Sequence, residues 1–88
     1  MRYEVQLAAA VSRQLKKLPR DIQRRVKDTI DSLEDDPRQP TAKKLQGAEN
    51  LWRVRVGDYR ILYEIEAAKY VVLVIRIAHR KEVYRKGT

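Results

Sequence analysis

The chain begins with a short alternating segment. Between residues 2 and 7, the apolar side chains Tyr3, Val5 and Leu7 alternate with polar ones. A period of two is typical of a strand that buries one face. The pattern therefore predicts a first strand over residues 2–7.

Two amphipathic helices are predicted to follow. Their apolar residues recur at three- and four-residue spacing, first as Val11, Leu15 and Leu18, then as Ile22, Val26, Ile30 and Leu33. This spacing places each set on one helical face. Pro19 separates the helices, because proline interrupts one helix and suits the first turn of the next. Pro37 excludes a helical conformation at Asp36 and ends the second. The two stripes predict a helical hairpin.

The second half of the chain reads as strands. Leu51 to Val56 alternates, Gly57-Asp58 is typical of a tight hairpin turn, and residues 59–65 alternate again. The β-branched run over residues 70–78 predicts a central strand buried on both faces. Residues 37–50, with two prolines and a glycine, are interpreted as a connecting loop.

These elements predict one domain over residues 1–88 with the order β-α-α-β-β-β. The economical architecture is an α+β fold, in which a mostly antiparallel sheet carries the helical hairpin on one face. At 88 residues, the chain has room for one modest core.

The charge is strongly positive and unevenly distributed. With 20 Lys+Arg and 12 Asp+Glu, the net charge is +8. Residues 1–40 carry nine basic and seven acidic side chains, whereas residues 41–88 carry eleven basic and five acidic ones. The excess favours a polyanionic partner that binds the second half, with solubility as the alternative explanation. The basic residues of the helices are interpreted as ordinary solvated faces.

Several classes of protein are excluded by composition. The chain has no cysteine and one histidine, which removes disulfide frameworks, thiolate nucleophiles and common zinc sites. We expect no metal and no cofactor. The apolar run from Tyr70 to Ile75 is far shorter than the roughly 20 residues of a membrane span. The first residues lack the apolar core of a signal peptide, which predicts a cytoplasmic protein without membrane contact.

The strand alternation predicts a cluster of arginines on the sheet. Arg53 and Arg55, with Arg60 on the next strand, fall on the face away from the helices. On the last strand, simple alternation predicts that Arg76 and Arg80 share a face with Val72 and Val74. A guanidinium group offers a planar fork of donors that suits phosphate oxygens. The alternative is a surface lattice in which these arginines pair with Glu64 and Glu66.

Two further candidates stand near the end of the chain. His79 is the side chain whose ordinary pKa is nearest neutrality, and it suits proton transfer. Tyr84 offers a ring for stacking on a nucleobase. Each also has a structural interpretation. His79 could have a purely structural role, and the Tyr84 ring could cover the edge of the core.

These segments resemble the RelE/ParE superfamily of toxins from toxin–antitoxin modules, over nearly the full length. The resemblance is carried by Lys44-Leu45-x-Gly47, by the run from Trp52 to Tyr63, and by His79-Arg80-Lys81-Glu82-Val83-Tyr84. It implies the RelE-like fold, which has the element order predicted above.

The resemblance also implies site residues, since RelE-like members are endoribonucleases that cut messenger RNA in the ribosomal decoding site. Arg60 would hold the scissile phosphate, and Arg80 would stabilise charge near the leaving oxygen. Tyr84 would orient a nucleotide and assist proton transfer. Arginine stays protonated, so His79 is a further candidate for that transfer. The remaining RNA-binding candidates are Lys44, Arg53, Arg55 and Lys81.

The implied reaction is a metal-free attack by the 2′-hydroxyl of RNA on its own phosphate. The implied partners are the 70S ribosome with its messenger RNA and a RelB-like antitoxin, whose acidic, partly disordered segment would fold on the toxin. Two alternatives remain open, a ParE-like inhibitor of DNA gyrase and a non-catalytic nucleic-acid-binding module.

Overall fold

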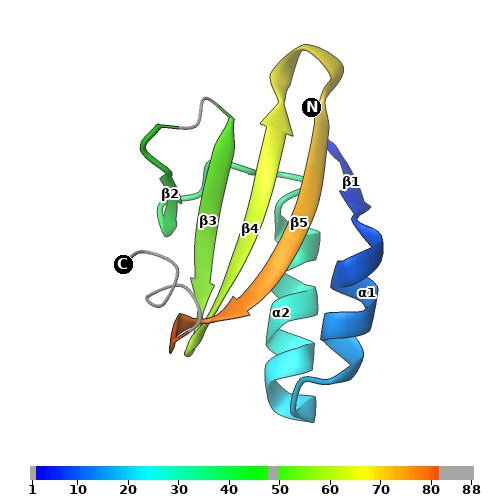
Figure 1. Cartoon of the computed structure of the whole chain (residues 1–88). Coiled ribbons are helices and arrows are strands. Elements are labelled where there is room, and N and C mark those ends of the chain that lie inside the picture. Colours follow the sequence, from blue (N-terminus) through cyan, green and yellow to red (C-terminus); the bar gives the residue numbers. More distant parts are fainter. Residues whose placement is uncertain (1, 48–49, 82–88) are drawn as a thin grey trace.

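The computed structural model describes residues 2–47 and 50–81 of the chain, which form a sheet and two helices (Figure 1). The helices are α1 (Ala9–Lys16) and α2 (Arg20–Ser32). The strands are β1 (Glu4–Leu7), β2 (Ala42–Lys44), β3 (Leu51–Val56), β4 (Tyr59–Glu66) and β5 (Val71–His79). A short 3₁₀ turn, η1 (Ala67–Lys69), joins β4 to β5.

The strands lie side by side in the order β1-β5-β4-β3-β2. β1 runs parallel to β5, and the other neighbouring pairs are antiparallel. The predicted α+β fold with a mostly antiparallel sheet is confirmed. One strand was missed, because β2 lies in the segment 37–50 that was interpreted as a loop. Its three residues are too few to produce a recognisable alternating pattern.

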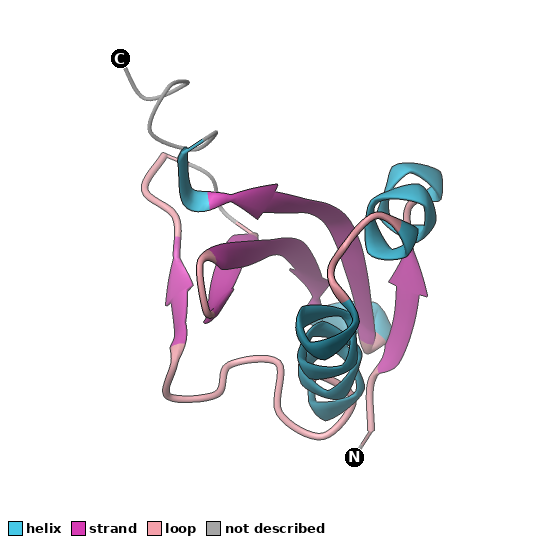
Figure 2. Cartoon of the chain, turned by 90° about the horizontal axis from the view of Figure 1, so that it is seen from below, coloured by secondary structure: helices cyan, strands magenta, loops and turns pink. Residues whose placement is uncertain are grey.

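The helical hairpin is confirmed. Pro19 takes the position just before α2, and the second helix ends at Ser32, four residues earlier than Asp36. Both helices lie away from β2, toward the β1 side of the sheet (Figure 2). In the described part of the chain, no helix is long and apolar enough to cross a membrane.

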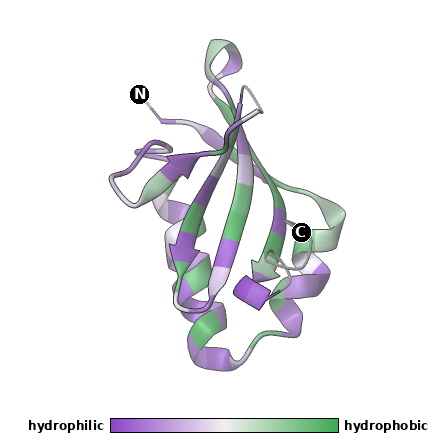
Figure 3. Cartoon of the chain, turned by 60° about the vertical axis from the view of Figure 1, so that its left-hand side comes forward, coloured by the Kyte–Doolittle hydropathy of each residue, from purple (hydrophilic) through white to green (hydrophobic). Residues whose placement is uncertain are grey.

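The core lies between the helices and one face of the sheet, which we call the covered face. Val11 and Val26 from the helices are fully buried against Val54, Ile61 and Val74 from the strands. Figure 3 shows the underlying alternation as hydrophobic and hydrophilic bands along the strands. The opposite side of the sheet, which we call the open face, is therefore available for polar side chains.

A buried tyrosine ties the segment before β2 to this core. The Tyr63 hydroxyl donates a 2.6 Å hydrogen bond to the carbonyl oxygen of Pro37. Burial, reinforced by the negative charge of Asp36, raises the pKa of Tyr63 to about 12. The guanidinium of Arg38 lies 5.9 Å from the centre of the Trp52 ring. These contacts fix the route of the chain into β2.

A bulge in β5 corrects the predicted position of Arg76. Leu62 pairs with Arg76 but Tyr63 pairs with Val74, so Ile75 is an additional residue in β5. Because one extra residue reverses the alternation, Arg76 lies on the open face and not with Val74. Simple alternation could not reveal this reversal.

The bulged part of β5 is held from the helical layer. Past the end of β1, the backbone N–H of Ile77 donates a 2.8 Å hydrogen bond to the Gln14 side-chain oxygen in α1. β5 is central, as predicted. It is not buried on both faces, however, because Val71 and Leu73 remain half-exposed on the open face.

Candidate functional site

Basic side chains gather on the open face over β2, β3 and β4. Cross-strand pairing places Lys43 opposite Arg53, and Arg55 opposite Arg60. Directly paired residues point to the same side of a sheet. A hollow of about 80 Å³, which we call the arginine pocket, is lined by Thr41, Lys43, Arg53, Arg55 and Arg60.

Two cationic residues of the arginine pocket are paired directly across neighbouring strands. Arg55 and Arg60 face each other across neighbouring strands, an arrangement that destabilises a sheet. The tight turn that starts at Gly57, with φ of 58°, fixes the register that brings them together. An anion placed in the pocket would offset the repulsion.

Arg60 differs from the other basic residues of the pocket in its burial. It is only 8% exposed, whereas Lys43 and Arg55 are exposed and Arg53 is half-exposed. Its guanidinium therefore has far less conformational freedom than a surface arginine. A charged fork held in this way is preorganised to bind a phosphate.

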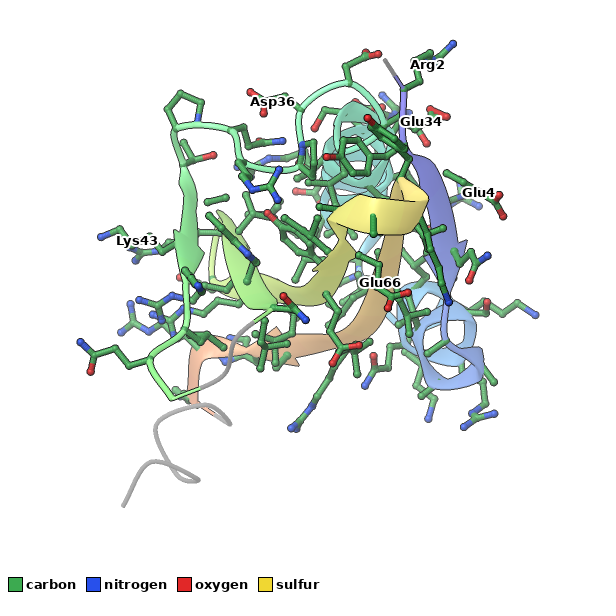
Figure 4. All side chains as sticks on the ribbon, turned by 90° about the horizontal axis from the view of Figure 1, so that it is seen from above. Arg2, Glu4, Glu34, Asp36, Lys43 and Glu66 are labelled. Carbon is green, nitrogen blue, oxygen red and sulfur yellow. The ribbon has the colours of Figure 1, made fainter. Side chains whose placement is uncertain are left out.

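The far end of the open face carries the opposite charge. Glu64 and Glu66 border a second hollow of about 190 Å³, with Val71 and Leu73 among its other lining residues. Glu66 forms its ion pair with Lys69, at 3.7 Å. Figure 4 shows Lys43 at the β2 edge, Glu66 nearer the middle of the view and Glu4 on the opposite side. Neither glutamate lines the arginine pocket, and Glu66 pairs with Lys69 instead, which disfavours the arginine–glutamate lattice.

Arg80 lies at the end of the sheet, two residues beyond Ala78, the cross-strand partner of Arg60. Its backbone N–H donates a 2.8 Å hydrogen bond to the Asp58 carbonyl oxygen. Its guanidinium lies 3.9 Å from the Asp58 carboxylate, and the side chain is half exposed. The β3–β4 turn therefore positions Arg80 beside the pocket without placing it among the lining residues.

His79 lies on the covered face, opposite Tyr59 in the pairing of β4 and β5. The two rings pack edge to face, with centroids 5.1 Å apart. The imidazole Nδ1 accepts a 3.2 Å hydrogen bond from the backbone N–H of Lys81, so in the neutral ring the proton is on Nε2. The structure does not bring His79 together with Arg60, and its catalytic role stays a prediction.

The lysine that joins the pocket is Lys43 and not the predicted Lys44. Lys44 pairs with Trp52 and is exposed at the covered-face side of the sheet edge. Lys43 and Thr41 were missed because β2 was not recognised, since its sequence Ala42-Lys43-Lys44 shows no alternation of apolar and polar residues. Lys81 is exposed next to Arg80. Tyr84 lies outside the described residues.

Comparisons with known proteins identify the family of the chain. The family model of the ParE toxin of the type II toxin–antitoxin system parDE matches residues 5–84. The chain belongs to this toxin family. Toxin RelG of Mycobacterium tuberculosis is 31% identical over 90 residues, covering 98% of this chain and 100% of the relative. Toxin RelE3 of Methanocaldococcus jannaschii is 31% identical over 85 residues, covering 92% of this chain and 94% of that one.

Solved structures of the same superfamily share the fold. The RelE chain matched in the archaeal RelE–RelB complex of Pyrococcus horikoshii OT3 has a TM-score of 0.80 and 32% identity, covering 91% of this chain and 97% of that chain. The chain matched in the RelBE2 toxin–antitoxin complex of Mycobacterium tuberculosis has a TM-score of 0.79 and 29% identity, and the match covers 91% of this chain and 100% of that chain. The protein is thus a type II toxin of the RelE/ParE superfamily, and its resemblance to that superfamily is confirmed.

Proposed function

We propose that this RelE/ParE toxin is a ribosome-dependent endoribonuclease that cuts messenger RNA at the arginine pocket. The observation that carries the proposal is the convergence of Lys43, Arg53, Arg55 and Arg60 on one hollow. Four cations on an open sheet face suit a phosphodiester backbone, and contacts to phosphate position a strand without reading its bases.

The chemistry needs a fixed cation at the scissile phosphate. In our proposal the RNA 2′-oxygen forms a bond to phosphorus, the bond from phosphorus to the 5′-oxygen breaks, and a 2′,3′-cyclic phosphate remains. The 2′-hydroxyl loses its proton and the leaving oxygen gains one. Arg60 stabilises the additional negative charge of the transition state, while Arg53 and Arg55 hold the neighbouring phosphates.

The remaining roles follow the family resemblance. Arg80, which Asp58 positions at the end of the sheet, would bind near the leaving oxygen. Tyr84 would orient a nucleotide and assist proton transfer. The resemblance also makes His79 a candidate for proton transfer, but its contact with Tyr59 on the covered face favours a packing role.

An antitoxin is the proposed protein partner. Several of the matched structures, including those from Pyrococcus horikoshii and Mycobacterium tuberculosis, are toxin–antitoxin complexes. We propose that a RelB-like partner of this toxin neutralises it with an acidic segment that covers the arginine pocket. Coupled folding of such a segment would allow it to wrap the basic surface.

Inhibition of DNA gyrase is the second candidate function. The observation in its favour is the matching family model, whose description names ParE. A gyrase inhibitor of this fold would act by binding alone, and the arginine pocket would then hold no scissile RNA.

Primer extension on messenger RNA from a cell-free translation reaction separates the two functions. With the purified toxin we expect cuts within translated codons, absent when ribosomes are omitted and lost in Arg60→Ala. The matched control is Arg2→Ala, which removes an exposed arginine whose ion pairs with Glu34 and Asp35 lie far from the pocket. Intact messenger together with blocked DNA supercoiling would instead support gyrase inhibition.

A further inference from the structure

The end of the molecule at which the two helices meet carries a second concentration of positive charge. Between residues 13 and 27 the chain has one acidic side chain, Asp21, whereas residues 28–36 contain five. We call the basic set the hairpin tip: Arg13, Lys16, Lys17, Arg20, Arg24, Arg25 and Lys27. All of its members are exposed.

Apart from Asp21 in its first turn, the charges of α2 run against the preference of a helix. Its basic residues begin at Arg20, the first helical position, and its acidic Asp28 and Asp31 lie in the second half. A helix prefers anions near its N-terminus and cations near its C-terminus. Within the part of the chain that the structure describes, no ion pair compensates a member of the hairpin tip. The exposed cations of the hairpin tip are thus accessible to an anionic partner.

The hairpin tip is continuous with the arginine pocket. A Cβ atom at Gly57 would lie 3.6 Å from the Arg25 guanidinium, so α2 places this charge over the β3–β4 turn. Arg55 and Arg60 lie just beyond that turn on either strand. The turn and the helical hairpin occupy the same end of the molecule (Figure 1). Apart from Asp58, whose carboxylate faces Arg80, the side chains around this turn therefore connect the basic residues of the helices with those of the open face.

The chemistry of the hairpin tip favours RNA over a protein partner. A shallow hollow of about 420 Å³ along α2 is lined by Arg20, Gln23, Arg24, Lys27, Asp28 and Asp31. The exposed large hydrophobic residues among those described are Leu7 and Tyr70, outside this surface. Protein interfaces depend on buried apolar anchors, whereas a phosphate backbone needs mainly cations.

We propose that the hairpin tip is a second RNA-binding surface, which holds the phosphate backbone of structured RNA while the arginine pocket holds the strand to be cut. The inference deepens the proposed function and rests on it, since ribosomal RNA would supply the structured partner. It also revises the interpretation of the helical basic residues as ordinary solvated faces.

Binding to an uncleavable RNA tests the proposal separately from catalysis. The probe is a fluorescent 2′-O-methyl RNA duplex of about 20 base pairs, followed by anisotropy from about 50 to 200 mM salt. The duplex lacks the attacking hydroxyl, so binding is measurable whether or not the protein cleaves RNA. The variant is Arg20→Gln/Arg24→Gln, and its control, Arg2→Gln/Lys69→Gln, removes the same charge at the acidic end.

We expect the tip variant to lower the slope of log affinity against log salt by about 2, one unit for each lost phosphate contact. Its affinity at the lowest salt should fall about 10-fold or more, and that of the control less than about 2-fold. Equal losses in the two variants would overturn the proposal, because net charge would then explain binding. Tighter binding of a polyglutamate peptide, lost in the same variant, would overturn it in favour of an acidic protein.

Discussion

Arg60 and Ile61 are consecutive residues of β4, both buried, and they point to opposite faces of the sheet. Ile61 is completely buried in the core between the sheet and the helices, whereas Arg60, 8% exposed, lines the arginine pocket. The comparison shows that burial has two purposes in this strand. On the covered face it stabilises the fold, and on the open face it holds a charge in a fixed position.

The same division extends across the sheet. Val54 and Ile77 pair with Ile61 on the covered face, while Arg55 pairs with Arg60 on the open face. Substitutions on the two faces should therefore have separable effects, on unfolding free energy in one case and on RNA cleavage in the other.

The largest effect on stability is expected for Ile61→Ala. Removing a completely buried isoleucine side chain should lower the unfolding free energy by about 2–5 kcal/mol, because a cavity remains in the core. Urea unfolding followed by circular dichroism measures this loss, with Leu7→Ala on the partly exposed edge as the control. A loss equal to that of the control would show that the covered face does not dominate stability.

The next largest loss of unfolding free energy is expected when the pH is raised, because Tyr63 lies buried on the covered face. The Tyr63 hydroxyl has a pKa of about 12 in the folded protein and about 10 when unfolded. Between these values the unfolded chain loses the proton first, so stability present below pH 10 is lost as the pH rises toward 12. Two pKa units correspond to at most about 2.7 kcal/mol.

Urea titrations at several pH values test this expectation, and Tyr63→Phe is the control. The variant loses the hydrogen bond to Pro37 and should be less stable at neutral pH by about 1 kcal/mol. Its stability should also fall less between pH 10 and 12. The same decline in both proteins would assign the alkaline effect to other groups.

A smaller loss of stability is expected when the hydrogen bond that holds the bulged part of β5 is removed. Gln14→Leu leaves the N–H of Ile77 without its side-chain acceptor and should cost about 1–2 kcal/mol. Gln14→Glu retains an oxygen acceptor and should cost less. Hydrogen exchange at Ile77 reports on this site directly, and unchanged protection in Gln14→Leu would contradict the assigned role.

The smallest expected effect on cleavage is that of His79→Ala. Because His79 packs against Tyr59 on the covered face, we expect less than about 3-fold change in single-turnover cleavage, well below the effect of losing a general acid or base. Stability should fall by about 1 kcal/mol through the lost ring contact. A cleavage loss near 10²-fold would instead place His79 in proton transfer.

Local patterns predicted the covered face well. The spacing of Val11, Leu15, Val26 and Ile30 and the alternation in β3 and β4 depend on neighbouring residues alone, and each corresponds to buried positions in the structure. The predicted arginines of the open face, Arg53, Arg55 and Arg60, also meet in one hollow, because the same alternation and a tight turn fix them.

What the sequence did not reveal depends on contacts between distant segments. β2 is defined by the pairing of its three residues with β3. The hydrogen bond from Tyr63 to Pro37 holds the segment that leads into it. The Ile75 bulge depends on the pairing with β4 and on Gln14 of α1. The first brings Lys43 into the pocket, and the second moves Arg76 to the open face. Neither interaction leaves a signal in a short window of sequence.

The central claim, that the open face holds the scissile phosphate at Arg60, is tested most directly by single-turnover cleavage of messenger RNA on ribosomes. Arg60→Ala should lower the rate by about 10²–10³-fold, as expected for a preorganised group at the transition-state charge, with the native helix and strand content retained. Arg2→Ala should cleave like the native protein. An Arg60→Ala rate within about 3-fold of native, in a folded protein, would contradict the account.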